Sequence, residues 1–241
     1  MEMEFSKGRF RVRLAEGAGD LAAVQGLRHL AFRGAEGRDQ DAFDAVSKHL
    51  MIEGLEDGRL VGTCRFQVFA ASADPGQGYT GQFYDLSAFR AFSAPILEIG
   101  RFCMRPGGHE PDMLRLAWAA LTRMVDAEGI ALLFGCTSFP GTEASDFADA
   151  LAALAGGHMA PLRYRPGRKA VEVVPLTPAA HDAGRALRQM PPLLRSYLAM
   201  GGWVSDHAVV DRDLGTLHVC TGVEIAAIPP SRARLLRADA R

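Results

Sequence analysis

The stretch Leu97-Glu98-Ile99-Gly100-Arg101-Phe102-Cys103 places two opposite charges in an otherwise apolar run. Residues 95–104 therefore predict a central strand inside the fold. Buried charges are costly unless paired, so Glu98 and Arg101 form either a structural ion pair or the centre of a functional site. Residues three apart on a strand point to opposite faces, but a bulge at Gly100 would reset that alternation. With such a bulge, Glu98 and Arg101 are expected to face one cleft.

The residues before this strand predict three elements. Alternation over 10–14 indicates a first strand, and helical spacing indicates a helix from Asp20, as its cap, to about Arg33. Residues 49–55 and 59–69 flank an Asp-Gly turn and predict a hairpin.

After the central strand, the pattern predicts a helix over 111–128, a buried strand over 130–137, a helix over 143–154 and a strand over 170–174. This order of elements favours a mixed α/β fold with a central sheet flanked by helices. Prolines then punctuate two short helices, and short strands are expected near Val209 and over 217–223. We expect residues 1–175 to form the core domain and residues 176–241 an α+β extension packed on it.

Composition limits the class of protein. The chain has 241 residues, 48% of them hydrophobic and 23% charged, with a net charge of −1, so nothing indicates a nucleic-acid partner. The four cysteines lack C-x-x-C spacing and are expected to be reduced core residues without a metal. No apolar signal core or run of ~20 apolar residues is present, so we expect a cytoplasmic protein, with peripheral contact to the inner membrane surface left open.

Further residues able to carry chemistry lie upstream of the central strand. They are Arg28 and Phe32 on one helix face, then Asp41, Asp44, His49 and Arg65. Each alone fits an ordinary role, such as a helix cap or a solvated charge. Together they supply acids, bases and cations around one strand.

These residues, in their order along the chain, resemble the bacterial ornithine-lipid N-acyltransferases of the GNAT superfamily. The matching motifs are Leu27-Arg28, Phe32, Asp41-Ala-Phe-Asp44, His49, Gly62-Thr-Cys-Arg65, Glu98-Ile-Gly-Arg101 and residues 133–142. Acyl-homoserine-lactone synthases are similar over about the first 130 residues. The resemblance to the ornithine-lipid enzymes continues through residues 191–204, so it covers most of the chain.

The resemblance implies a GNAT-like fold and transfer of a 3-hydroxy fatty acyl group from acyl carrier protein to the α-amine of ornithine. The product would be a lyso-ornithine lipid. The carrier's phosphopantetheine arm would serve as co-substrate, with no other cofactor and no metal. Two alternatives stay open: an N-acyltransferase that acts on another amino acid or forms an acyl-homoserine lactone, and a non-catalytic domain that binds acyl carriers.

The loop at 105–112 favours a carrier-bound donor. Ordinary GNAT enzymes bind the coenzyme A pyrophosphate with a Q/R-x-x-G-x-G/A loop, and this chain has Arg105-Pro-Gly-Gly-His-Glu-Pro-Asp112. The glycines and the helix start can receive a phosphate. Glu110 and Asp112 would repel a pyrophosphate, whereas a carrier protein presents a single phosphate.

Each candidate residue has an expected role. Glu98 is the first choice for the general base and His49 the second, with Arg101 orienting Glu98 or binding a substrate carboxylate. A backbone N–H beyond Gly100 is expected to stabilise the oxyanion. Asp41 and Asp44 are expected to hold cationic amines of the acceptor. The expected substrate site is completed by Arg28, Phe32, Arg65 and Ser138. Ser138 is not preferred as a nucleophile, because no base neighbours it in sequence.

Basic and aromatic clusters suggest where the partners bind. Two sets of cations are candidates for docking the acidic carrier protein: Arg163, Arg165, Arg168 and Lys169, or Arg185, Arg188 and Arg195. The C-terminal Arg232, Arg234 and Arg237 are candidates for contact with an anionic membrane. Each set also fits an ordinary solvated face. Phe83, Phe89, Phe92 and Phe102 are expected either to line an acyl tunnel or to form ordinary core.

Overall fold

The computed structural model describes residues 3–107 and 110–240. The chain divides into two compact units. The first contains the residues up to Gln67, Ile99–Gly129 and those from Ala233 onward, and the second contains Val68–Glu98 and Ile130–Arg232. The division does not coincide with the boundary expected at residues 175 and 176, which stays a prediction. No helix in the described part of the chain is both long and apolar enough to cross a bilayer.

The strands of the first unit follow the order β1-β2-β3-β4-β6. Their bounds are β1 Glu4–Lys7, β2 Phe10–Leu14, β3 Lys48–Gly54, β4 Leu60–Phe69 and β6 Ile96–Met104, and β4 and β6 each run on into the second unit. The expected hairpin is β3 and β4, and Gly58 supplies the positive φ of 64° that its turn requires.

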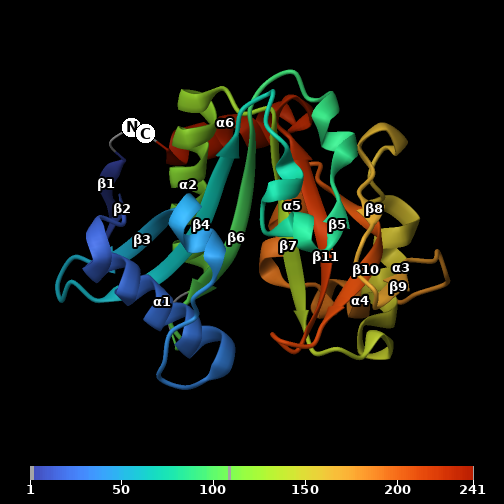
Figure 1. The fold of residues 1–241 in the computed structure, drawn as a ribbon, viewed down its shortest axis with the longest axis horizontal. Coiled ribbons are helices and arrows are strands. Elements are labelled where there is room, and N and C mark those ends of the chain that lie inside the picture. Colours follow the sequence, from blue (N-terminus) through green and yellow to red (C-terminus); the bar gives the residue numbers. More distant parts are fainter. Residues whose placement is uncertain (1–2, 108–109, 241) are drawn as a thin grey trace. The chain divides into compact units, whose positions relative to one another are not determined.

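Two long helices of the first unit, α1 (Gly17–Arg33) and α2 (Glu110–Glu128), pack against β3 (Figure 1). Val24 and Leu27 of α1 join Met51, Leu60 and Cys103 in a buried cluster. The helix begins after Glu16 rather than at Asp20, because the Asp20 carboxylate instead binds Arg13 and the Glu16 N–H. The last helix, α6, spans Pro230–Asp239.

The second unit is built on the strand order β6-β7-β11-β10-β9. Their bounds are β7 Leu132–Pro140, β9 Val173–Pro175, β10 Trp203–Asp211 and β11 Thr216–Glu224, and a separate two-stranded sheet pairs β5 (Tyr84–Asp85) with β8 (Gly167–Arg168). Strand β7 is parallel to β6 and antiparallel to β11. The strand expected over 217–223 is β11, one residue longer at each end, and it pairs with β7 inside the sheet (Figure 1).

The two faces of this sheet are covered by different parts of the chain. Helices α3 (Ala148–Gly157), α4 (Ala183–Gln189) and α5 (Pro192–Ala199) cover the face that carries Phe139, Leu217 and Val219. Residues 69–92 cover the other face, which carries Leu132, Phe134 and Cys220. This division follows strand alternation, because neighbouring residues point to opposite faces. Phe89 and Phe92 belong to this second cluster and Phe83 packs against it.

The remaining elements are short 3₁₀ turns. They are η1 Ala42–Val46, η2 Pro75–Gln77, η3 Thr80–Gln82, η4 Ser87–Ala91, η5 Ala144–Phe147, η6 Leu162–Tyr164 and η7 Ile225–Ala227. The four cysteines lie outside disulfides in the described chain, and Cys136 alone among them is only partly buried.

Candidate active site

Glu98 lies in the second unit at the end of the parallel ladder between β6 and β7. The ladder pairs Ile96–Glu98 with Leu132–Phe134. Glu98 is 5% exposed, and its carboxylate accepts hydrogen bonds from two consecutive backbone N–H groups, those of Tyr79 (3.0 Å) and Thr80 (2.5 Å). These two hydrogen bonds fix the position of the carboxylate.

The loop that supplies these N–H groups leaves no room for a side chain at Gly78. A Cβ there would lie 2.4 Å from Oε2 of Glu98 and 2.9 Å from Cζ of Phe69. The loop is equally tight at Gly81, where a Cβ would lie 2.3 Å from the carbonyl oxygen of Gly76. The two glycines therefore let the backbone close around the carboxylate.

Replacement of Gly78 by alanine is expected to displace the Glu98 carboxylate from its two N–H donors. The sequence predicts that Glu98 is a general base, and a misplaced base loses rate steeply, so on that prediction we expect kcat to fall about 10²-fold with a smaller change in KM. Steady-state kinetics would measure both constants. Gly156→Ala is the matched control, since a Cβ there meets nothing within 4 Å and Gly156 has no positive φ. Combining Gly78→Ala with Glu98→Asp should restore part of the lost kcat, because the shorter side chain withdraws from the added methyl. Wild-type kcat in Gly78→Ala would contradict this account.

Further polar side chains lie on the Glu98 face of this sheet or pack against that face. Cys136 contacts Thr80 through Sγ and Oγ1 (3.7 Å), and Ser138, two residues further along β7, is exposed and pairs in register with His218 on β11. His218 is buried, and burial lowers its pKa to about 4, so it is neutral at pH 7. Tyr84 donates a hydrogen bond to the His218 carbonyl oxygen (2.9 Å). By strand geometry, Ser138 lies roughly 13 Å along β7 from Phe134, the register partner of Glu98.

The first unit contains a buried network of three arginines and three aspartates, which we call the Arg–Asp network: Arg28, Arg65, Arg101, Asp39, Asp41 and Asp44. Arg28, fully buried on α1, binds Asp39 (2.7 Å) and Asp44 (2.8 Å). Arg65 on β4 binds Asp41 and Asp44. The network thus joins a helix, a loop and two strands, and its formal charges cancel.

Asp44 is the most heavily bonded carboxylate of the Arg–Asp network. It accepts hydrogen bonds from Arg28, Arg65 and Gln25, and it closes a capping box with Asp41 at the start of η1. Burial alone would raise the pKa of Asp44, but these hydrogen bonds and the Arg28 charge outweigh burial and hold its pKa well below the usual range. Asp41 is the most exposed of the three carboxylates, at 22% of its side chain.

Arg101, which follows Gly100 in β6, takes a left-handed backbone conformation. Its φ is +52°, and it is the one non-glycine residue with a positive φ in the described chain. A non-glycine residue in this region costs about 1–2 kcal/mol. The guanidinium binds Asp39 (2.9 Å) and Asp41 (3.2 Å), which offsets that cost. The left-handed residue is thus the neighbour of Gly100, and the bulge expected at Gly100 stays a prediction.

His49 lies beside the Arg–Asp network. The His49 ring nitrogen Nε2 donates to the Asp44 carbonyl oxygen (3.2 Å), and burial lowers the His49 pKa, so the ring is neutral. Its lone pair then lies on Nδ1, which is buried and has no partner within the described residues. Phe32 packs against the apolar cluster beneath α1.

The structure therefore brings together six of the nine candidate residues in the first unit: Arg28, Asp41, Asp44, His49, Arg65 and Arg101. Glu98 and Ser138 belong to the second unit. Sequence reasoning missed Asp39, Tyr79, Thr80 and His218. Tyr79 and Thr80 act through backbone N–H groups, which every non-proline residue has, and the available signal was the glycine spacing of residues 76, 78 and 81.

Comparisons with known proteins define the class. A family model described as an acetyltransferase (GNAT) domain matches residues 26–119, which include the C-terminal part of α1, the Arg–Asp network and Glu98. The fold is thus a GNAT acyltransferase fold, as the resemblance implied, and the protein is an acyltransferase.

The relatives define the family more narrowly. The chain is 34% identical over 229 residues to the L-ornithine N(alpha)-acyltransferase of Rhodobacter capsulatus, which covers 87% of this chain and 88% of that protein. It is 30% identical to the enzyme of the same name from Rhizobium meliloti, and the match covers 95% of this chain and 84% of that protein. Among solved structures, it is similar to the AHL synthase LasI, with a TM-score of 0.45, 15% identity and 90% of each chain covered. The chain belongs to the family of the L-ornithine N(alpha)-acyltransferases.

Proposed function

We propose that this protein transfers a 3-hydroxy fatty acyl group from acyl carrier protein to the α-amine of ornithine and forms a lyso-ornithine lipid. Family membership supports the acceptor, because relatives that match nearly the full chain carry that name. The observation that carries the chemistry is the buried Glu98 carboxylate, held by the N–H groups of Tyr79 and Thr80.

Glu98 acts as the general base in this proposal. An α-ammonium group must lose a proton before its nitrogen can attack a thioester, and a positioned carboxylate can take that proton. The nitrogen then bonds to the thioester carbon, the C–S bond breaks, and the pantetheine sulfur leaves as a thiolate that takes up a proton. His49 is the second candidate, and its neutral ring fits a proton acceptor, but its free nitrogen is buried.

The Arg–Asp network has a positioning role in this proposal. Its members bind one another, and through Asp39 and Asp41 they hold Arg101 in its left-handed conformation immediately after the Glu98 segment of β6. The expected contacts of Arg28, Phe32, Asp41, Asp44 and Arg65 with substrate remain proposals, and Asp41 has the largest exposed fraction for such a contact. Ser138 is retained as a substrate-binding candidate because it is exposed on the Glu98 face.

A turnover assay with 3-hydroxyacyl carrier protein against a panel of amino acids tests the acceptor. Ornithine should give the highest kcat/KM, with the amide on the α-nitrogen identified by mass spectrometry. Preference for lysine or glutamine would assign a sibling N-acyltransferase, and lactone formation would assign a homoserine-lactone synthase. Carrier binding without any amide product would assign a non-catalytic domain.

The donor is tested by comparing acyl carrier protein with acyl-CoA of the same chain. We expect kcat/KM to be at least about tenfold higher with the carrier, a difference of ~1.4 kcal/mol, because Glu110 and Asp112 would repel a pyrophosphate. This loop lies partly outside the described residues, at 108 and 109. Glu110→Gln with Asp112→Asn should improve use of acyl-CoA selectively, and equal use of both donors by the wild type would overturn this account of the loop.

A further inference from the structure

The segment from Leu162 to Val171 carries the two most exposed large hydrophobic side chains in the described chain. Val171 is fully accessible at 102%, and Leu162 is 81% exposed. Single exposed aliphatic side chains are common on protein surfaces, so these two matter only together with the charged residues that lie between them in the sequence.

The same segment is strongly basic. Its ten residues contain Arg163, Arg165, Arg168 and Lys169 and no acidic residue, in a chain of net charge −1. Arg163 lies 3.5 Å from Glu224 and remains 69% exposed. The following residue, Glu172, is engaged by Arg212. The segment therefore presents a concentrated positive charge beside two bare aliphatic side chains.

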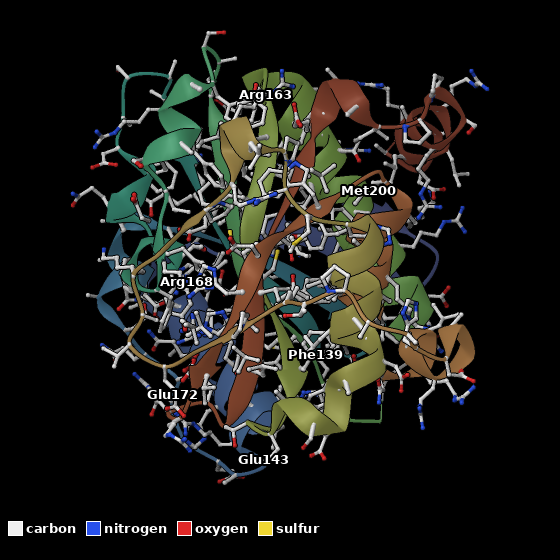
Figure 2. The ribbon with its side chains drawn as sticks, turned by 90° about the vertical axis from the view of Figure 1, so that its right-hand side faces the viewer. Phe139, Glu143, Arg163, Arg168, Glu172 and Met200 are labelled. Carbon is white, nitrogen blue, oxygen red and sulfur yellow. The ribbon has the colours of Figure 1, made fainter. Side chains whose placement is uncertain are left out.

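The exposure does not result from a loose loop. Arg165 donates to the Ala160 carbonyl oxygen (3.1 Å), and β8 within the segment pairs with β5. The Tyr164 ring stacks on Phe92 (4.3 Å between centroids), and the Arg163 guanidinium lies 4.5 Å from the Tyr164 ring. Figure 2 shows the stretch from Arg163 through Arg168 to Glu172 on the face turned toward the viewer. The segment is a fixed surface, which we call the 162–171 surface.

We propose that the 162–171 surface docks this protein on an anionic lipid bilayer. Exposed aliphatic side chains and cations in one short segment are the combination that binds at a bilayer interface, where the apolar groups enter the acyl boundary and the cations meet the anionic headgroups. The two aliphatic side chains stand at opposite ends of the segment with the cations between them. A bilayer accepts apolar groups at any such spacing, whereas a protein partner must supply a shaped pocket for each.

The 162–171 surface is tied directly to the loop that holds Glu98. Lys169 donates to the Gly81 carbonyl oxygen, and Ala170 N–H donates to that of Phe83 (2.9 Å). These contacts lie one and three residues beyond Thr80, whose N–H binds the Glu98 carboxylate. If the proposed function holds, bilayer docking brings the candidate active site next to the membrane that would receive an amphiphilic product.

Co-sedimentation of the full chain with lipid vesicles tests the proposal without any substrate. The vesicles are phosphatidylcholine alone, or with a quarter of phosphatidylglycerol, at ~0.1 M salt. The wild type should bind the anionic vesicles, and Leu162→Ser with Val171→Ser should lower its partition coefficient about tenfold or more. Arg163→Gln with Arg168→Gln should remove the preference for anionic vesicles.

Two exposed leucines supply matched controls. Leu187→Ser on α4 (55% exposed) and Leu235→Ser on α6 (49% exposed) should leave vesicle binding unchanged. Loss of binding in Leu235→Ser instead would assign the contact to the C-terminal helix and overturn the proposal, as would a wild type that binds neither vesicle. A raised KM for acyl carrier protein in the arginine variant, with vesicle binding intact, would make the surface a protein-docking site. Turnover measured without vesicles reports on the proposed function separately.

Discussion

Replacement of Glu98 by glutamine is expected to lower kcat by about 10²–10⁴-fold, the usual contribution of a positioned general base. The amide cannot accept the ammonium proton at pH 7. In the wild type, the N–H groups of Tyr79 and Thr80 donate to the two carboxylate oxygens. In the variant, the NH₂ group of the amide would face one of these donors and could not accept its hydrogen bond. The loss should therefore appear in kcat more than in KM.

The measurement is single-turnover acylation of ornithine from 3-hydroxyacyl carrier protein, with circular dichroism to establish that the variant is folded. Glu172→Gln is a suitable control, because Glu172 forms an exposed ion pair in the same unit. Rates within threefold of wild type from pH 6 to 9 would remove Glu98 as the base. His49→Gln would then be the next variant to test.

Replacement of Asp44 by alanine is expected to lower the free energy of unfolding by about 3–5 kcal/mol. Asp44 receives hydrogen bonds from Arg28 and Arg65, which are 0% and 3% exposed, and its loss leaves buried guanidinium groups without that partner. Urea denaturation followed by fluorescence would measure the change. Asp126→Ala is the matched control in the same unit. It removes an exposed ion pair with Arg237, for which a change of no more than ~1 kcal/mol is expected. Similar changes in both variants would mean that the Arg–Asp network contributes little.

The contribution of Asp44 to the free energy of unfolding should also depend on pH, and it should decrease in acid. The pKa of Asp44 is lowered in the folded state relative to its ordinary value of 3.8. The stabilisation is therefore fully present above that value and is lost as pH falls through the folded-state pKa. The difference in the free energy of unfolding between the wild type and Asp44→Ala should narrow as pH falls below 3.8. A difference that stays constant below this pH would contradict the lowered pKa of Asp44.

Much of the fold was accessible from sequence because it depends on local periodicity. The hairpin, the two long helices and the strands β6 and β7 all follow hydrophobic spacing and turn residues that lie within a few positions of one another. The position of β11 beside β7 was not accessible, because strand order depends on pairing between residues about 80 positions apart, such as Cys136 and Cys220.

The strand at 97–103 shows the same division between what the sequence predicts and what the tertiary structure decides. The sequence by itself determined that Glu98 and Arg101 are charges in a buried strand, and that the motifs around them belong to one acyltransferase family. The tertiary structure decided their partners. Glu98 is held by backbone N–H groups, which carry no residue-specific signal, and Arg101, which has a positive φ, is bound through its guanidinium by distant aspartates. The residue type determines which chemistry a side chain can perform. The hydrogen-bond donors and opposite charges that orient the side chain come from segments that only folding brings together.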